Sequence, residues 1–173
     1  MIGLGDFVVM ADTGEEISAA GLEPERAVCA IAAQKAKNVS LFFDKDDIIV
    51  AADTLVYLDG EPMGKPDDED DAARMLRRQS GRRHTVYTGI AIMRGATLVT
   101  GAEATEVFFR ELSDGEIAAY IKTGEPMDKA GAYGAQGRGA LLIERIEGDF
   151  FNVMGLPLCR LTMMLRSFGV FLG

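Results

Sequence analysis

The sequence predicts a globular protein of the α/β class, and three observations support that prediction. Segments of strand length and of helix length alternate along the chain. The 173 residues are 48% hydrophobic and 26% charged, which is typical of a folded domain rather than a disordered one. A chain of this length buries enough surface to fold without a disulfide or a structural metal ion. We therefore expect a single domain over residues 1–173.

The first half of the chain predicts a strand, a helix and a hairpin. The apolar run FVVMAD, residues 7–12, is typical of a short buried strand. A helix is expected over residues 22–40, with a proline in its first turn and lysines near its end. Residues 47–53 form a continuous apolar run, which favours a strand covered on both faces. The dipeptide Asp59-Gly60 then predicts a tight hairpin turn.

The second half predicts two helices around a pair of long strands. Residues 66–81 form a helix with acids in the first turn and arginines in the last, as the helix dipole favours. Strands are expected over residues 84–93 and 97–109. A short helix over residues 113–124 carries the capping box Ser113 to Glu116.

The C-terminal third predicts a shaped loop, a strand and a last helix. Residues 123–140 contain five glycines among alanine, tyrosine and methionine, which indicates a structured loop rather than a flexible linker. A strand follows over residues 139–146. The final helix begins near Leu156, and its methionines at 163 and 164 favour core or dimer contacts over a cofactor site.

Charge and hydropathy exclude several classes of partner. With 18 basic and 27 acidic residues, the net charge of −9 disfavours binding to a DNA or RNA polymer. No apolar run approaches the length of a membrane span, and the N-terminus lacks a basic region like that of a signal peptide. Two distant cysteines, Cys29 and Cys159, are expected as buried free thiols. We therefore expect a soluble cytoplasmic protein without a membrane or nucleic-acid partner.

A carboxylate and a lysine in IIVAADTLVYLDGEPMGKP suggest a site for small anions. Asp53 ends the apolar run, where ligands of α/β sheets commonly bind. Lys65 stands between Gly64, which allows close backbone approach, and Pro66, which fixes the chain direction. The segment lacks the GxxxxGK[ST] pattern of a P-loop, so neither residue alone identifies a phosphate site.

Further polar residues belong to segments that the fold can bring together. Glu15 follows the first strand, Lys35 lies near the end of the first helix, and Gln136 lies in the glycine-rich loop. Carboxylates bind Mg²⁺ or Mn²⁺, lysines bind phosphate oxygens, and glycine-rich loops commonly line small-molecule sites. A Ser/His/Asp triad would need His84 as its base, but the sequence has no GxSxG elbow.

Four motifs in order and register resemble the Maf family of nucleotide pyrophosphatases. They are AADTLVYLDGEPMGKP, SGRRHTVYTGIAI, TGEPMDKAGAYGAQGRGA and IEGDFFNVMGLPL. The resemblance runs from about residue 7 to the C-terminus. It implies an α/β fold related to inosine-triphosphate pyrophosphatases, with a mixed sheet, flanking helices and a central cleft between two lobes.

The resemblance also implies an activity and roles for individual residues. Family members hydrolyse nucleoside triphosphates to the monophosphate and pyrophosphate with Mg²⁺ or Mn²⁺. Asp53 matches the catalytic aspartate, which activates water or holds the metal. Glu15 matches a residue beside the metal, and Lys35 and Lys65 match residues beside the phosphates. A homodimer is also expected from the family.

Two positions resemble the subfamily that prefers dTTP and UTP. They are Thr54, directly after the aspartate, and Gln136. A primary amide suits a uracil or thymine base because it offers both a donor and an acceptor to the O4 and N3–H edge.

The sequence differs from the family pattern at its N-terminus. Family members carry an SxSPRR loop that grips the triphosphate, and this sequence has no such segment. We therefore expect the first strand–loop–helix unit to be missing and activity to be reduced. Two alternatives stay open: a nucleotide-binding regulatory protein without useful turnover, and a pyrophosphatase directed at purine nucleotides.

Overall fold

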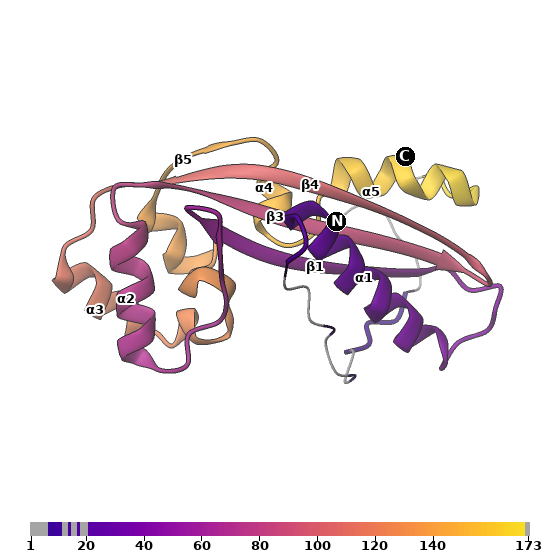
Figure 1. The fold of residues 1–173 in the computed structure, drawn as a ribbon, viewed down its shortest axis with the longest axis horizontal. Coiled ribbons are helices and arrows are strands. Elements are labelled where there is room, and N and C mark those ends of the chain that lie inside the picture. The colour runs from indigo at the N-terminus through magenta and orange to yellow at the C-terminus, as the bar shows by residue number, and fades with distance from the viewer. Residues whose placement is uncertain (1–6, 12–13, 15–16, 18–20, 172–173) are drawn as a thin grey trace. The chain divides into compact units, whose positions relative to one another are not determined.

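The computed structural model describes residues 7–11, 14, 17 and 21–171, and the chain divides into two compact units (Figure 1). Within the described residues, unit 1 draws on the ranges 1–53, 88–103 and 156–173. Unit 2 consists of residues 54–87 and 104–155. Strands β1 (Ile49–Leu58), β3 (Arg83–Arg94) and β4 (Thr97–Phe109) each begin in one unit and end in the other.

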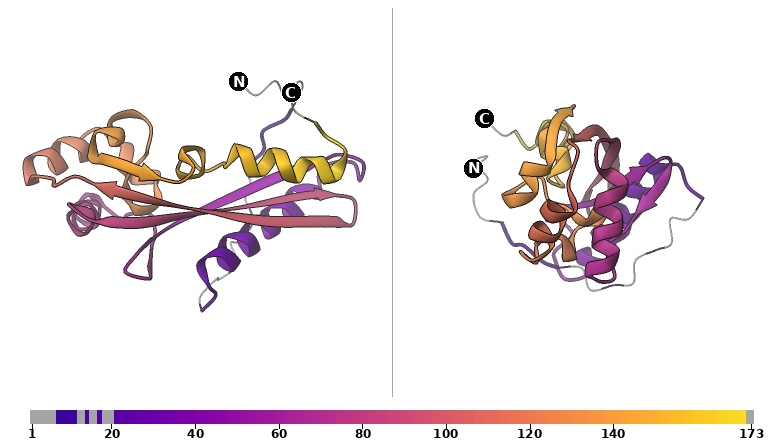
Figure 2. Two further views of the ribbon diagram at one scale, coloured as in Figure 1. Left: turned by 90° about the horizontal axis from the view of Figure 1, so that it is seen from above. Right: turned by 90° about the vertical axis from the view of Figure 1, so that its left-hand side faces the viewer.

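The sheet has five strands in the order β2-β1-β3-β4-β5. Their bounds are Ile49–Leu58 for β1, Glu61–Met63 for β2, Arg83–Arg94 for β3, Thr97–Phe109 for β4 and Ile143–Glu147 for β5. Figure 2 shows β3 and β4 as long neighbouring ribbons, which pair through a tight turn at Gly95. The β1–β2 turn has positive φ at both Asp59 and Gly60, the geometry of a type I′ hairpin.

The α/β class with helices flanking a sheet is confirmed. The described strands pair antiparallel, as the registers Val56↔Met63 and Val107↔Ile146 show for the two outer pairs. Because β1 enters unit 2 while β3 leaves it, their pairing is antiparallel too. The family resemblance implied a mixed sheet, but the strand pairs in the part of the chain that the structure describes are antiparallel.

Unit 1 packs helix α1 (Pro24–Ser40) and helix α5 (Leu158–Leu165) with its part of the sheet. Small residues let α1 approach the strands closely: Ala32 and Ala36 of the helix cluster with Ala91 of β3. At Gly89 of β3 a Cβ atom would lie 2.4 Å from the Val28 carbonyl, so only glycine fits there. Helix α5 packs Leu161 and Leu165 into a second cluster.

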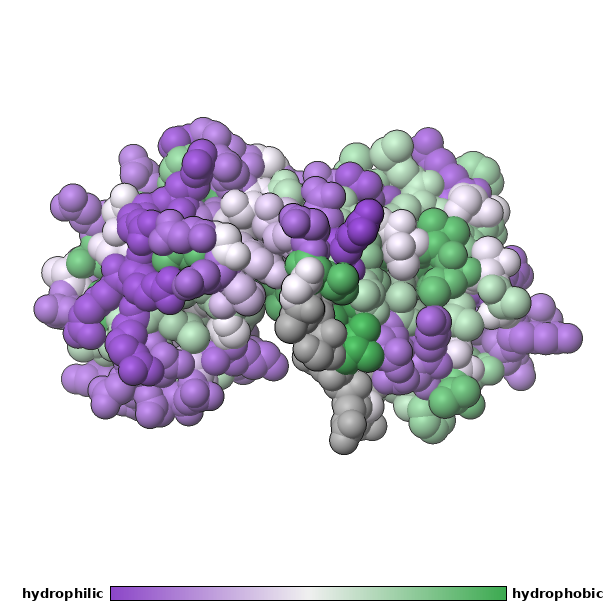
Figure 3. Space-filling model, viewed as in Figure 1, coloured by the Kyte–Doolittle hydropathy of each residue, from purple (hydrophilic) through white to green (hydrophobic). Residues whose placement is uncertain are grey.

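Unit 2 packs helices α2 (Glu69–Gln79) and α3 (Asp114–Ile121) and the short α4 (Phe150–Val153) around a larger core. Helix α3 begins with the predicted capping box between Ser113 and Glu116. Leu58, Leu76 and Phe109 are among the buried side chains of this core. The outer face of α2 is charged, and Figure 3 shows a largely hydrophilic surface over it.

Three expectations about the strands need correction. Residues 7–11 of the predicted first strand have no regular structure, and Val8 and Val9 are largely exposed. The strand expected over 47–53 begins at Ile49 and continues to Leu58, because the residues after Asp53 are strand formers that pair with β2 and β3. The strand expected from residue 139 begins only at Ile143, because Gly137–Leu142 forms a 3₁₀ helix.

The start of the last helix and the exposure of the cysteines differ from the sequence expectations. The last helix begins at Leu158, with Pro157 as its N-cap. Both cysteines are free, but Cys159 is exposed and Cys29 only partly buried, so the expectation of two buried thiols was wrong. Among the described helices, none has the length and hydropathy that a bilayer crossing demands.

Candidate active site

The carboxylate of Asp53 and the ammonium of Lys35 form a close ion pair in unit 1. The Lys35 Nζ atom lies 2.6 Å from Asp53 Oδ1. The side chains are only 22% and 11% exposed, respectively, which separates this pair from the solvated ion pairs elsewhere on the protein. The sequence predicted both residues as site residues, and the structure brings them together.

The alternation of side chains along β1 explains why Asp53 meets Lys35. Ile49 and Ala51 pack against the cluster formed by Ala32, Ala36 and Ala91, so this face of β1 is turned toward α1. Because side chains of a strand alternate between faces, Asp53 continues the same face two residues later. Lys35 comes one position before the buried Ala36 on α1, and its long side chain reaches the carboxylate.

Asp53 lies in the middle of β1 rather than at a strand end. The sequence argument for a strand-end carboxylate therefore does not apply, and the cation beside Asp53 is Lys35. Asp53 is the last residue of the first segment of unit 1, and Thr54 is the first residue of unit 2. A carboxylate on a hydrogen-bonded strand is held more rigidly than one on a loop.

Carboxylate oxygen is the ligand type that Mg²⁺ and Mn²⁺ prefer. Among the described residues no three His, Cys, Asp or Glu side chains converge as a preformed cation cage. Mg²⁺ commonly binds through one or two carboxylates together with substrate phosphates, and such a site needs no larger cage. The partly buried Asp53 carboxylate fits this type of site. Glu15, the other predicted ligand, lies outside the described residues.

Lys65 follows β2 in unit 2 and is exposed. The preceding residue is fixed by the glycine-rich loop, since the Gly131 N–H donates to the Gly64 carbonyl at 3.0 Å. The Asp128 carboxylate lies nearby, and its pKa is lowered mainly by a hydrogen bond from Lys129 and also by the charge of Lys65. Asp128 is thus paired directly with Lys129, at 2.7 Å, and is attracted more weakly by Lys65.

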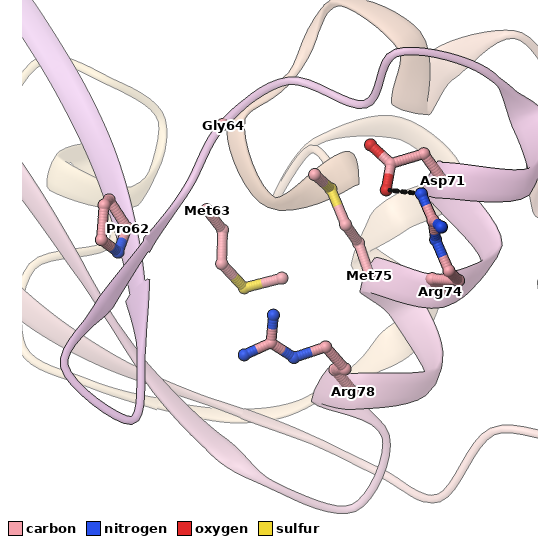
Figure 4. A pocket seen from close by; sticks show the side chains of 7 residues that line it. All are labelled: Pro62, Met63, Gly64, Asp71, Arg74, Met75 and Arg78. Carbon is pink, nitrogen blue, oxygen red and sulfur yellow. Dashed lines mark hydrogen bonds and ion pairs between the residues drawn. The ribbon is translucent and has the colours of Figure 1, made fainter.

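A pocket of about 310 Å³ opens between β2 and α2, beside the segment that carries Lys65 (Figure 4). Met63 and Met75 provide its apolar wall. Its cations are already paired: Arg74 Nη2 lies 2.8 Å from Asp71 Oδ1, and Arg78 Nη2 lies 3.1 Å from Glu61 Oε2. None of the predicted site residues lines this pocket, so it does not mark the predicted site.

The glycine-rich loop is a shaped loop, as expected. It forms three 3₁₀ turns, Glu125–Asp128, Ala130–Ala132 and Gly137–Leu142. Residues 131–135 are buried, whereas Gln136 is exposed. The loop thus presents the predicted base-reading amide at the surface of unit 2.

Thr54 lies beside the turn that follows helix α4. A Cβ atom built at Gly155 would lie 3.4 Å from the Thr54 hydroxyl oxygen, and Gly155 has a φ of +102°. Asn152 fixes this turn, because its buried amide donates to the Val86 carbonyl and to the Thr105 hydroxyl oxygen. A residue of the IEGDFFNVMGLPL motif, Gly155, therefore lies next to Thr54, which the sequence predicts as a specificity residue.

Sequence reasoning missed a buried aromatic and polar cluster in unit 2. His84 Nε2 lies 2.8 Å from the Tyr133 hydroxyl oxygen, and both side chains are at most 5% exposed. Burial lowers the pKa of His84 to about 4, so the ring is neutral at physiological pH. The signal in the sequence was Tyr133 itself, a bulky residue between two glycines of an otherwise small-residue loop.

Comparisons with known proteins support a family assignment. The family model described as Maf-like protein matches residues 1–168. A protein from Bacillus velezensis named dTTP/UTP pyrophosphatase is 46% identical over 164 residues, which cover 95% of this chain and 86% of that protein. Proteins of the same name from Dictyoglomus turgidum and Moorella thermoacetica are 46% and 53% identical, over 97% and 86% of this chain and 88% and 77% of theirs.

Proposed function

The chain belongs to the family of Maf-like proteins, and from that premise we propose that it hydrolyses dTTP and UTP to the nucleoside monophosphate and pyrophosphate. The observation that carries the proposal is the Lys35–Asp53 pair, a carboxylate and an ammonium 2.6 Å apart in a mostly buried setting. Relatives that are 46–53% identical to this chain over the aligned residues are named dTTP/UTP pyrophosphatase. In this proposal residues 1–173 act as one functional domain.

Asp53 is the catalytic residue of the proposed reaction. Its carboxylate orients the attacking water and accepts a proton from it, or holds the divalent cation that binds the water. Lys35 keeps the carboxylate in one orientation through its short contact at Oδ1. General-base catalysis of this kind contributes roughly 10²- to 10⁴-fold to a rate.

Mg²⁺ or Mn²⁺ is the proposed cofactor, with Asp53 and Glu15 as its protein ligands. When bound, the cation would neutralise charge on the triphosphate and polarise the phosphoryl group that is attacked. Lys65 is the proposed partner of the phosphate oxygens, and Lys35 contributes positive charge beside Asp53. Charge-assisted contacts of this type are about twice as strong as neutral hydrogen bonds.

Gln136 and Thr54 are the proposed specificity residues. The Gln136 amide can donate to O4 and accept from N3–H of uracil or thymine, and cytosine offers the opposite pattern at this edge. Gln136 is exposed, as a residue that meets a ligand must be. A cytoplasmic location and a homodimeric state complete the proposal.

Release of pyrophosphate from a panel of nucleotides tests the proposal. The panel contains dTTP, UTP, CTP, ATP, GTP and ITP, each with Mg²⁺ or Mn²⁺. We expect dTTP and UTP to give the highest kcat/KM and pyrophosphate to be the inorganic product. A rise in melting temperature with dTTP, without any release of pyrophosphate, would instead indicate a binding protein and overturn the proposal.

A matched pair of variants isolates the role of Asp53. Asp53→Asn removes the charge with little change in shape and is expected to lower kcat at least 100-fold, within the range for general-base catalysis. Asp114→Asn makes the same change in an exposed ion pair with Arg77 and is expected to leave kcat unchanged. Preference for ITP or for a methylated GTP over dTTP would contradict the assigned base specificity.

A further inference from the structure

Three aromatic rings form a buried cluster beneath the glycine-rich loop. Tyr133 of the loop contacts His84 of β3 and Phe109 of β4, with ring centroids 5.2 and 4.8 Å apart in edge-to-face geometry. The His84 and Phe109 rings meet in the same way at 5.0 Å. Such pairs have a preferred geometry, so the tyrosine ring is fixed by two neighbours at once.

The hydrogen bond between His84 and Tyr133 is the polar contact of this cluster. It joins two neutral groups, because burial lowers the pKa of His84 to about 4 and raises that of the Tyr133 phenol. His84 Nδ1 has no hydrogen-bond partner among the described residues. Among the described residues, the Tyr133 hydroxyl is therefore the hydrogen-bond partner of the imidazole, which β3 and the Phe109 ring hold in place.

Hydrogen bonds anchor the loop on both sides of Gln136. On the N-terminal side, the Gly134 N–H donates to the Tyr120 hydroxyl oxygen at 3.2 Å, next to Tyr133. On the C-terminal side, the Arg138 N–H donates to both oxygens of Glu125 at 3.1 Å.

Gly137 has a φ of +67°, which favours glycine, and a Cβ atom there would meet the Glu125 carboxylate that forms the C-terminal anchor. Only three residues, 135–137, lie between the Gly134 and Arg138 anchors. The backbone that carries Gln136 is thus held at a point two residues away on each side.

We propose that the His84–Tyr133 hydrogen bond positions Gln136 and thereby sets the affinity and selectivity for the pyrimidine base. His84 is a positioning residue here, since it acts through Tyr133 and the loop. The inference rests on the proposed function, in which the Gln136 amide reads the base. It also assigns a role to the single histidine of the chain that is separate from acid–base catalysis.

In this proposal the His84–Tyr133 hydrogen bond affects binding of the base and leaves the chemistry at the phosphates unchanged. Loosening the loop weakens the interaction with the base, which is made equally in the bound substrate and in the transition state. Loss of such uniform binding raises KM and leaves kcat unchanged. Loss of a neutral hydrogen bond corresponds to roughly a three- to tenfold change in KM.

The first experiment compares two Tyr→Phe variants of unit 2. Tyr133→Phe keeps the ring and removes the hydroxyl, and we expect KM for dTTP and UTP to rise three- to tenfold at constant kcat. Selectivity for UTP over CTP should fall by a similar factor. Tyr87→Phe, the control, makes the same change on β3 in a ring that packs against Tyr57, and should leave both constants unchanged.

A double-mutant cycle tests whether the effect passes through Gln136. In the Gln136→Ala background, Tyr133→Phe is expected to add nothing to KM for dTTP. His84→Gln retains a neutral side chain that can hydrogen-bond the tyrosine, and should keep KM within about twofold of the parent. Equal losses of kcat and of affinity for every nucleotide in Tyr133→Phe would indicate a general loss of structure and overturn the inference.

The single histidine allows a direct spectroscopic readout. With ¹⁵N-labelled histidine, the Nε2 resonance of His84 should shift in Tyr133→Phe and stay in place in Tyr87→Phe. Suppose that the parent hydrolyses dTTP and that Gln136→Ala relaxes its selectivity. If Tyr133→Phe then leaves KM unchanged, the positioning role of His84 and Tyr133 is refuted and the proposed function stands. If the parent releases no pyrophosphate from any nucleotide, the proposed function fails and the inference with it.

Discussion

The free energy of unfolding should depend on pH through His84 in a way that one substitution can isolate. The imidazole has a pKa of about 4 in the folded protein because burial disfavours its charged form. In the unfolded chain its pKa is the ordinary 6.5. The unfolded state therefore binds more protons between these values, and stability is fully present above pH 6.5 and lost as the pH falls toward 4.

The magnitude follows from these two values. Integrating the linkage relation gives a loss of about 2 kcal/mol by pH 5 and about 3 kcal/mol by pH 4, relative to pH 8. Carboxylates also titrate in this range, but they contribute equally to a variant that differs only at residue 84. The difference in stability between the parent and His84→Gln is therefore the informative quantity.

Urea denaturation at pH 8, 6, 5 and 4 measures that difference. The parent should lose about 3 kcal/mol relative to His84→Gln between pH 8 and pH 4. NMR titration of the single histidine provides a second check, with an expected pKa near 4. A stability difference that stays constant over this range, or a titration near pH 6.5, would refute the reasoning that burial dominates the site.

Three further predictions concern packing, the phosphate contact and the turn after α4. Gly89→Ala should lower the free energy of unfolding by about 1–3 kcal/mol or more, measured by urea denaturation, because its Cβ would lie 2.4 Å from the Val28 backbone. Gly115→Ala, which has open space around it, should leave that free energy unchanged. Lys65→Gln should raise KM for dTTP roughly ten- to hundredfold, the effect of losing one charge-assisted contact, and an unchanged KM would remove this lysine from the site. Asn152→Leu should cost about 1–3 kcal/mol because two buried partners of its amide lose a donor, and a neutral effect in urea denaturation would contradict that account.

Local sequence signals predicted most of the elements in the described part of the chain. The capping box at Ser113, the Asp59-Gly60 turn and the dipole-matched helix over Glu69–Gln79 depend on residues close in sequence, and all three are found. The run at residues 7–11 is apolar, but the described residues form no strand there. An apolar run specifies a strand only where neighbouring strands accept its backbone hydrogen bonds.

The candidate site was predictable in part. The sequence predicts Asp53 and Lys35 as separate site residues, and their contact depends on the close packing of α1 against β1 and β3 through alanine and Gly89. No local pattern reveals such a contact between segments 18 residues apart. The anchoring of the glycine-rich loop by His84 was missed for the same reason, since the two residues of that hydrogen bond are 49 positions apart.

Product analysis at saturating dTTP is the most direct test of the central claim. The parent protein, with Mg²⁺ or Mn²⁺, is expected to convert dTTP to dTMP and pyrophosphate in equal amounts, and Asp53→Asn should do so at least 100-fold more slowly. Formation of dTDP and orthophosphate would contradict the claim. So would equal rates for the parent and the Asp53→Asn variant.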